Sequence, residues 1–264
     1  MTRLGPDLKT TVVEVRAKVG RQCVVVPRSQ IVDAIAPRYP AEREGIVIDL
    51  TNVEGEGTAF LETAKDTIRY HVERLSASST GSGRREHFSL FALAPIPLLV
   101  FLGNQLGNKI PIELYQRHRD TEDWTWKTPG TAVTYQFRQI RRGSDLSKVA
   151  LILSLSGTIL PLDLPPDIDR DFFLYEITLA DAKPNPAFLR TKMDLAEFKN
   201  VYQLSLRTIM RDHVGLDTVS LFPAVPAPIA VLCGRELLPK VDPTLRVYDN
   251  NKSLGGFVFT MEVN

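Results

Sequence analysis

The sequence predicts an α/β protein made of two similar halves, each with a mainly parallel sheet. One reason is a repeat: "SLFALAPIPLLVFLG", residues 89–103, returns as "SLFPAVPAPIAVLCG", residues 220–234, at an offset of 131 residues, the distance from Ser89 to Ser220. The other is that strand-like and helix-like segments alternate in the same order around both copies. That order is typical of parallel sheets with right-handed crossovers.

The repeated segment is interpreted as a strand that passes into a helix. "SLF" is a short apolar strand pattern, and the Pro-x-Pro that follows suits the first turn of a helix but cannot continue a central strand. Because the same step occurs twice, we expect the halves to pack about a pseudo-twofold axis. Without gaps, the offset matches Leu90/Leu221, Phe91/Phe222, Pro95/Pro226, Pro97/Pro228, Val100/Val231 and Gly103/Gly234.

The other elements follow from hydrophobic periodicity. In the first half, "GIVIDLTN" (45–52) predicts a buried strand and a helix begins at Thr58, followed by a loop over 78–85. In the second half, "KVALILSLSG" (148–157) is interpreted as the matching strand, and a helix begins at Asp194, where Asp194 and Glu197 form a capping-box pattern. Each half closes with a further strand, "KIPIELYQ" or "TLRVYDN".

Two segments fall outside the repeat. Residues 160–193 are interpreted as an insertion with one extra strand, "FFLYEITL", which we expect to cover the sheet or to contact a partner. Residues 10–27 suggest a small strand pair, "TVVEV" and "CVVVP". The predicted organisation is therefore an N-terminal strand pair or linker (1–44), a first half (45–145) and a second half (146–264).

The composition is that of a soluble globular protein. Of 264 residues 44% are hydrophobic, and 32 Lys and Arg against 31 Asp and Glu leave a net charge of +1, which gives no long-range attraction to duplex DNA or to acidic membranes. Cys23 and Cys233 have neither disulfide-framework nor zinc spacing, which fits a reducing cytoplasm. We find no signal-peptide pattern and no apolar run near the ~20 residues that span a bilayer.

Parallel sheets bind ligands beyond the carboxyl ends of their strands. Four loops are expected there, 50–57, 92–97, 154–158 and 223–228, and free backbone N–H groups at the two proline-led helix starts would suit an anion. Two such starts across a pseudo-twofold axis predict a pocket for a ligand with repeated phosphates. The alternative, that Pro-x-Pro only marks the strand-to-helix step, is equally open. The candidate ligand residues here are Thr51, Asn52, Pro95, Pro97, Ser154, Ser156, Gly157, Thr158, Pro226 and Pro228.

A second candidate segment is "ELYQRHRDTEDWTWK", residues 113–127. Arg117 and Arg119 could contact phosphates, and Trp124 or Trp126 could stack on a base. The alternative is an ion-paired loop with one tryptophan buried.

Enzyme signatures are not found in the sequence. The four histidines, His71, His87, His118 and His213, are scattered, and HExxH, GxSxG and Walker patterns do not occur. We therefore predict no catalytic residue and no metal ligand, and favour binding over catalysis.

The segment "HFSLFALAPIPLLVFLGNQLGNKIPIELYQRHRDTEDWTW" (87–126), together with residues 220–249, resembles the SAVED domain, the sensor module of bacterial antiphage (CBASS) effectors. The resemblance extends from about Gly45 to the C-terminus. It implies two fused CARF-like halves with a Rossmann-like core that bind a cyclic oligonucleotide second messenger made by a CD-NTase enzyme. It also implies a linked effector, such as an HNH nuclease or a TIR domain, that ligand-driven oligomerisation switches on.

This sequence departs from that pattern because residues 1–44 are too short for an effector domain. We expect an excised sensor, or an effector on a separate chain. The resulting hypothesis is a cytoplasmic, non-catalytic sensor of a cyclic di- or trinucleotide, with no other cofactor and no direct binding of duplex DNA or membrane. Two alternatives are a ring nuclease that cleaves the bound ring, and a scaffold that assembles through its apolar insertion.

Overall fold

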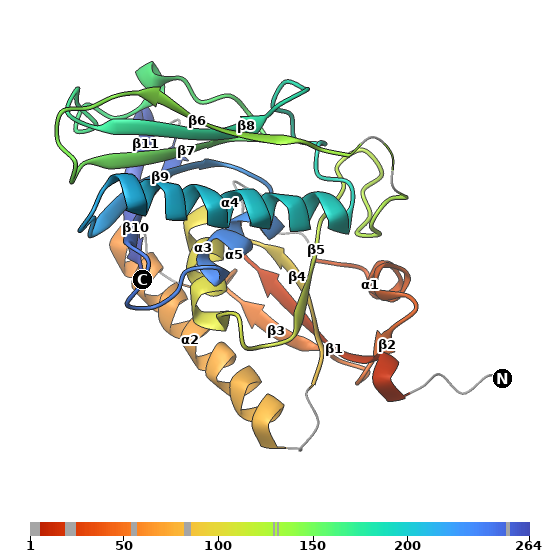
Figure 1. Cartoon of the computed structure of the whole chain (residues 1–264). Helices are drawn as coiled ribbons and strands as arrows, with labels where there is room; N and C mark the ends of the chain where they lie inside the picture. The colour runs from red at the N-terminus through yellow and green to blue at the C-terminus, as the bar shows by residue number, and fades with distance from the viewer. Residues whose placement is uncertain are drawn as a thin grey trace.

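The computed structural model describes residues 6–18, 25–53, 57–81, 86–128, 130, 132–251 and 254–264. Two sheets lie on either side of a layer of helices (Figure 1), which confirms the predicted α/β fold class. In the first sheet, parallel strands follow the order β3-β1-β4-β5, and the short β2 also pairs with β1. The second sheet has the order β11-β10-β9-β7-β8-β6.

The strands of the first sheet are β1 (Lys9–Arg16), β2 (Tyr39–Pro40), β3 (Ile46–Asp49), β4 (Phe88–Leu93) and β5 (Ile112–Tyr115). Those of the second are β6 (Tyr135–Arg141), β7 (Val149–Ser154), β8 (Phe173–Leu179), β9 (Thr218–Ala224), β10 (Thr244–Asn251) and β11 (Gly256–Val263). The helices are α1 (Arg28–Ile35), α2 (Gly57–Gly81), α3 (Ile96–Leu106), α4 (Lys192–Asp212) and α5 (Ala227–Arg235).

The two halves repeat the same topology, but with a different correspondence of strands from the one predicted. β1 lies between β3 and β4, and β7 lies between β8 and β9. α2 joins β3 to β4 as α4 joins β8 to β9. The counterpart of β7 is therefore β1, and "FFLYEITL" is not an insertion but the counterpart of β3. Within the predicted segment, β8 itself is a buried strand of the sheet, whereas the residues before it, among them Ile168 and Phe172, cover the outer face of the sheet as expected; contact with a partner stays a prediction.

The halves meet where α3 packs against α5 in the middle of the molecule (Figure 1). A methyl group on Gly103 would lie 1.8 Å from the carbonyl oxygen of Val231, and one on Gly234 would lie 1.8 Å from that of Val100. The 131-residue offset relates Gly103 to Gly234 and Val100 to Val231, so the two contacts are equivalent and the packing is pseudo-twofold. Glycine is required at both positions because the two helix backbones touch there.

The central strands of each sheet are buried on both faces, and their side chains alternate between two apolar clusters. In β4, Leu90 packs into the core between the sheets, whereas Phe91 points to the outer face with α1. In β7, Leu151 faces the same central core, and Ile152 packs outward beneath the loop that joins β7 to β8. The helices therefore fill the centre, and α1 and this loop close the outside.

A half-buried arginine ties the halves together near this contact. The Arg235 guanidinium, at the end of α5, donates hydrogen bonds to the carbonyl oxygens of Gly107, Ile110 and Ile112, which connect α3 to β5. Burial lowers the pKa of Arg235 from its ordinary value, because the charged form loses water. The three carbonyls replace that lost solvation.

Three local predictions differ from the structure. α2 runs to Gly81, so the loop predicted from residue 78 is wrong for 78–81, while 82–85 lie outside the described residues. Residues 25–27 of the predicted "CVVVP" strand form no strand, and 23–24 lie outside the described residues. At α4 the capping box is formed by Thr191 and Asp194, one turn earlier than predicted, with Thr191 Oγ1 accepting from the Asp194 N–H at 3.1 Å.

Two antiparallel strands, β6 and β11, were not predicted; they close the edges of the second sheet. β6 lies in the predicted first half yet pairs with β8, and β1 lies in the predicted linker yet pairs with β3 and β4. The domain boundaries at residues 45 and 146 stay predictions.

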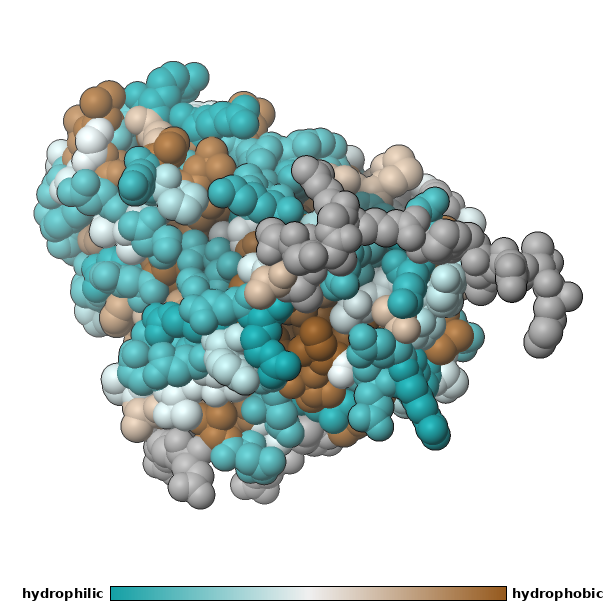
Figure 2. Space-filling model, turned by 90° about the horizontal axis from the view of Figure 1, so that it is seen from below, coloured by the Kyte–Doolittle hydropathy of each residue, from teal (hydrophilic) through white to brown (hydrophobic). Residues whose placement is uncertain are grey.

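Figure 2 shows hydrophilic residues over most of one face, with hydrophobic residues gathered in a recess near its centre. Among the helices that the structure describes, none combines the length and apolar character that crossing a bilayer requires.

Candidate functional site

A cavity of about 1240 Å³ opens where the carboxyl ends of both sheets converge. Residues at or just after the carboxyl ends of β1, β4 and β5 form one wall, and residues at or just after those of β7, β8, β9 and β10, together with Phe257 of β11, form the other. Its lining comprises Ala17, Lys18, Leu93, Ala94, Pro95, Ile96, Leu99, Gln116, Arg117, Arg119, Glu122, Ser156, Gly157, Thr158, Ile159, Pro186, Pro223, Ala224, Val225, Pro226, Ala227, Asp249, Asn250 and Phe257.

The topology explains why the cavity lies there. From β1 the chain crosses to β3 on one side and then returns to β4 on the other, and β7, β8 and β9 follow the same course. These switch points open a crevice beyond the strand ends in each half. The pseudo-twofold packing of α3 on α5 places the two crevices together.

The starts of α3 and α5 contribute equivalent positions to the cavity. Ile96 and Ala227, related by the 131-residue offset, are the first residues of the two helices, and both line the cavity. Neither helix has a side-chain N-cap hydrogen bond. Backbone donors at uncapped helix starts attract anions.

Of the four predicted prolines, Pro95 and Pro226 line the cavity as the N-cap residues of the two helices. Pro97 and Pro228 are buried within the first turns and do not line it. Because proline has no N–H, neither of these two can donate to an anion.

The loop after β7 contributes Ser156, Gly157 and Thr158 to the lining of the cavity, and all three are predicted ligand residues. Ser154 is 0% exposed and stays out of it. Its hydroxyl oxygen accepts the N–H of Ile159 at 3.2 Å, and its carbonyl oxygen accepts the Thr178 hydroxyl at 3.0 Å. Ser154 therefore shapes the loop instead of offering a donor.

The loop after β5 supplies cationic groups. Arg117 and Arg119 both line the cavity, and Lys18, which follows β1, lines it as well. One carboxylate accompanies them, since Glu122 lies 3.9 Å from the Arg117 guanidinium. These cations give one wall the charge that phosphate groups require.

Neither tryptophan lines the cavity. Trp124 is 1% exposed and packs edge-on against Phe91, with 5.3 Å between ring centroids, in the cluster that holds α1 on the first sheet. Trp126 is half-buried and its indole N–H is covered by protein. This packing leaves no face of Trp124 open for a base to stack on. Trp124 is therefore the buried tryptophan of the alternative interpretation.

Thr51 and Asn52 also lie away from the cavity lining. They follow β3, which is an edge strand of its sheet, whereas the crevice forms beside β1 and β4. The Thr51 hydroxyl and backbone N–H both donate to Asp49. This turn ends the strand locally, and residues 54–56 of the same loop lie outside the described residues.

His118, on the same loop as the arginines, is expected to stay neutral far below neutral pH. Burial, with Lys127 nearby, lowers its pKa to about 4. Between pH 6.5, the ordinary histidine value, and about 4, the unfolded chain binds this proton and the folded chain does not, so acidification lowers the free energy of unfolding. An NMR titration assigned with His118→Gln should give a midpoint near pH 4. A midpoint within about half a unit of 6.5 would contradict this account.

Several lining residues were not singled out from the sequence: Lys18, Gln116, Asp249, Asn250 and Phe257. The signal for Lys18 was the strand β1, whose central position was not recognised. Asp249 and Asn250 end the predicted closing strand "TLRVYDN", just as Gln116 follows the closing strand of the first half. The ends of the closing strands are therefore a sequence signal for lining residues, because these strands adjoin the switch points.

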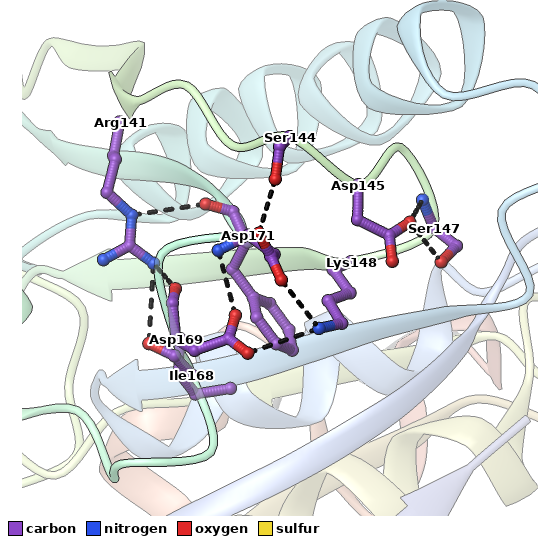
Figure 3. A network of polar contacts seen from close by, with 9 residues as sticks. Arg141, Ser144, Asp145, Ser147, Lys148, Ile168, Asp169 and Asp171 are labelled. Carbon is purple, nitrogen blue, oxygen red and sulfur yellow. Dashed lines mark hydrogen bonds and ion pairs between the residues drawn. The ribbon is translucent and has the colours of Figure 1, made fainter.

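The loop between β7 and β8 lines the cavity at its start and is held at its far end by a polar network (Figure 3). Lys148 lies 3.3 Å from Asp169 and 3.4 Å from Asp171, which also accepts the Ser144 hydroxyl. Arg141 donates to the carbonyl oxygens of Ile168, Asp169 and Phe172. Within the described ranges, no group of three His, Cys, Asp or Glu side chains could hold a metal ion.

Comparison with known families decides what kind of protein carries this cavity. Residues 68–263 match the SAVED family, described as the SMODS-associated and fused to various effectors sensor domain. The chain belongs to the SAVED family. It is therefore a SAVED sensor domain, as the resemblance implied. The comparison with curated proteins gave no match.

Solved SAVED structures share the fold. The Acinetobacter baumannii Cap4 SAVED/CARF-domain receptor with the cyclic trinucleotide 2′3′3′-cAAA matches with a TM-score of 0.61 and 12% identity, over 97% of this chain and 51% of that one. The same receptor with 3′3′3′-cAAA matches with a TM-score of 0.60 and 13% identity, over 97% of this chain and 52% of that one. The Moraxella osloensis Cap4 SAVED/CARF-domain receptor matches with a TM-score of 0.55 and 12% identity, over 97% of this chain and 50% of that one. The chain spans about half the length of these receptors.

Proposed function

We propose that this SAVED domain binds one cyclic di- or trinucleotide in the cavity between its halves. The observation that carries the proposal is the meeting of two equivalent, uncapped helix starts, at Ile96 and Ala227, in one cavity. Phosphates of the ring contact these starts, together with Ser156, Thr158, Arg117 and Arg119. The cyclic trinucleotides in the titles of the similar Cap4 structures support this class of ligand.

Ligand binding acts as a signal in this proposal. A ring made by a CD-NTase enzyme drives self-association of the domain, and assembly activates an effector such as a nuclease, in the same chain or in another. The chain itself has no catalytic part in this proposal, and cytoplasmic location remains an expectation from its cysteine usage. The family description, with its reference to fused effectors, supports the link to an effector.

The test is isothermal titration of the folded chain with a panel of cyclic di- and trinucleotides, with linear dinucleotides as controls. We expect one cyclic species to bind saturably and linear controls not to bind. Chromatography of the same mixtures should show no linear product; its appearance would favour the ring nuclease. Absence of binding across the panel would contradict the proposal and favour a scaffold.

A further inference from the structure

The two walls of the cavity differ in chemistry although the halves share one topology. Lys18, Arg117 and Arg119 make the wall of the first half cationic. The wall of the second half carries the apolar side chains of Ile159, Val225 and Phe257 beside Asp249 and Asn250 of β10. Phosphates suit the first wall and the helix start and hydroxyls of the second, whereas the flat, weakly polar base of a nucleotide suits the apolar part of the second wall.

Asp249 is the unexpected group in a site for an anion. Glu122, the other carboxylate of the lining, lies near Arg117, whereas Asp249 forms no ion pair with any residue that the structure describes, and its carboxylate accepts only the backbone N–H of the adjacent Asn250. The carboxyl is half-buried, and burial raises its pKa from the ordinary aspartate value, with only the Asn250 backbone N–H opposing the shift. A carboxylate placed there repels phosphate and requires a donor.

Asp249 lies one residue from Asn250, whose β11 partner is Phe257. Phe257 is held rigidly because its ring packs edge-on against Phe222, with 5.4 Å between centroids, and Phe222 stacks on Tyr248. Side chains alternate along a strand, so Asp249 and Phe257 lie on opposite faces of the sheet, and both line the cavity at the strand ends. A base that lies in the cavity against its apolar lining brings the hydrogen-bonding groups at its edge to Asp249.

We propose that Asp249 accepts a hydrogen bond from the exocyclic amino group of one base of the ligand, so that the domain selects a base that carries this amino group over one that lacks it, such as uracil or hypoxanthine. The inference rests on the proposed function and adds its base specificity. A partly desolvated acceptor that loses its donor is left unpaired, which gives strong discrimination against an analogue without the amino group.

The experiment compares 3′3′3′-cyclic triadenylate with its hypoxanthine analogue, in which each amino group is replaced by a carbonyl, for wild type and Asp249→Asn. We expect wild type to bind the adenine ring about tenfold or more tightly than the analogue, and Asp249→Asn to bring the two affinities within about threefold. Glu122→Gln removes the other carboxylate of the lining and should leave the wild-type ratio unchanged. Thermal melts of all variants establish that they fold.

The outcomes are separable. Binding of both rings by wild type with equal affinity, or an unchanged ratio in Asp249→Asn, overturns the base assignment and leaves the proposed function standing. A cyclic triadenylate with 2′-deoxyribose tests whether the donor is a ribose hydroxyl. If Asp249→Asn abolishes the affinity difference between the ribose and deoxyribose rings, but keeps the preference for adenine over hypoxanthine, the donor is a hydroxyl and the inference is wrong. If wild type binds neither these rings nor any in the wider panel, the proposed function itself fails.

Discussion

Gly234→Ala is expected to lower the free energy of unfolding by about 3 kcal/mol or more, at the upper end of overpacking effects. The added methyl group would lie 1.8 Å from the carbonyl oxygen of Val100, which is backbone and cannot rotate away. α3 and α5 must separate, and this contact joins the two halves. Urea denaturation followed by circular dichroism measures the loss.

Gly157→Ala is the matched control, since nothing lies within 4 Å of a methyl group there, and its stability should be unchanged. Gly103→Ala meets Val231 in the equivalent way. Once one methyl group has separated the helices, the second causes less additional overlap. The free energy of unfolding of the double variant should therefore fall by less than the sum of the two single decreases. Additive losses, or a Gly234→Ala variant as stable as wild type, would contradict the pseudo-twofold contact.

The double variant Arg117→Ala with Arg119→Ala is expected to weaken binding of the cyclic ligand by about 100-fold, since each charge-assisted contact to phosphate contributes about tenfold. Both side chains line the cavity and lie on one loop after β5. The affinity of the variant should also depend less steeply on salt. Fluorescence anisotropy with a labelled ring at several salt concentrations measures both effects.

Arg142→Ala provides the control, because Arg142 is exposed and does not line the cavity. Its affinity and salt dependence should equal those of wild type. Thermal melts should be similar for all three proteins, since the contact of Arg117 with Glu122 is long and exposed pairs contribute little. An unchanged affinity in the double variant would remove this loop from the site.

Local constraints made the strand-to-helix steps predictable from the sequence. Proline at Pro95 and Pro226 cannot continue a central strand, so the starts of α3 and α5 follow from chemistry within a few residues. Strand order depends instead on pairing between distant segments. "KVALILS" and "GIVIDL" are both apolar strands, and no local pattern shows that the strand of the first half equivalent to "KVALILS" is β1 and not "GIVIDL".

The candidate site divides in the same way. The loops after β4, β7 and β9 were placed at the cavity because they belong to the repeated unit. Thr51 was misplaced because β3 is an edge strand, and Trp124 because its burial depends on Phe91 and α1, which lie far from it in sequence. Asp249 was missed because a lone carboxylate acquires meaning only from the cavity around it.

The central claim is that both halves bind a single ring, and hydrogen exchange measured by mass spectrometry tests it most directly. With the bound ring at saturation, amides in peptides that cover the start of α3, at Ile96, and the start of α5, at Ala227, should both exchange more slowly, at a titrated ratio of one ring per chain. Slower exchange at only one helix start, or two rings per chain, would contradict the account.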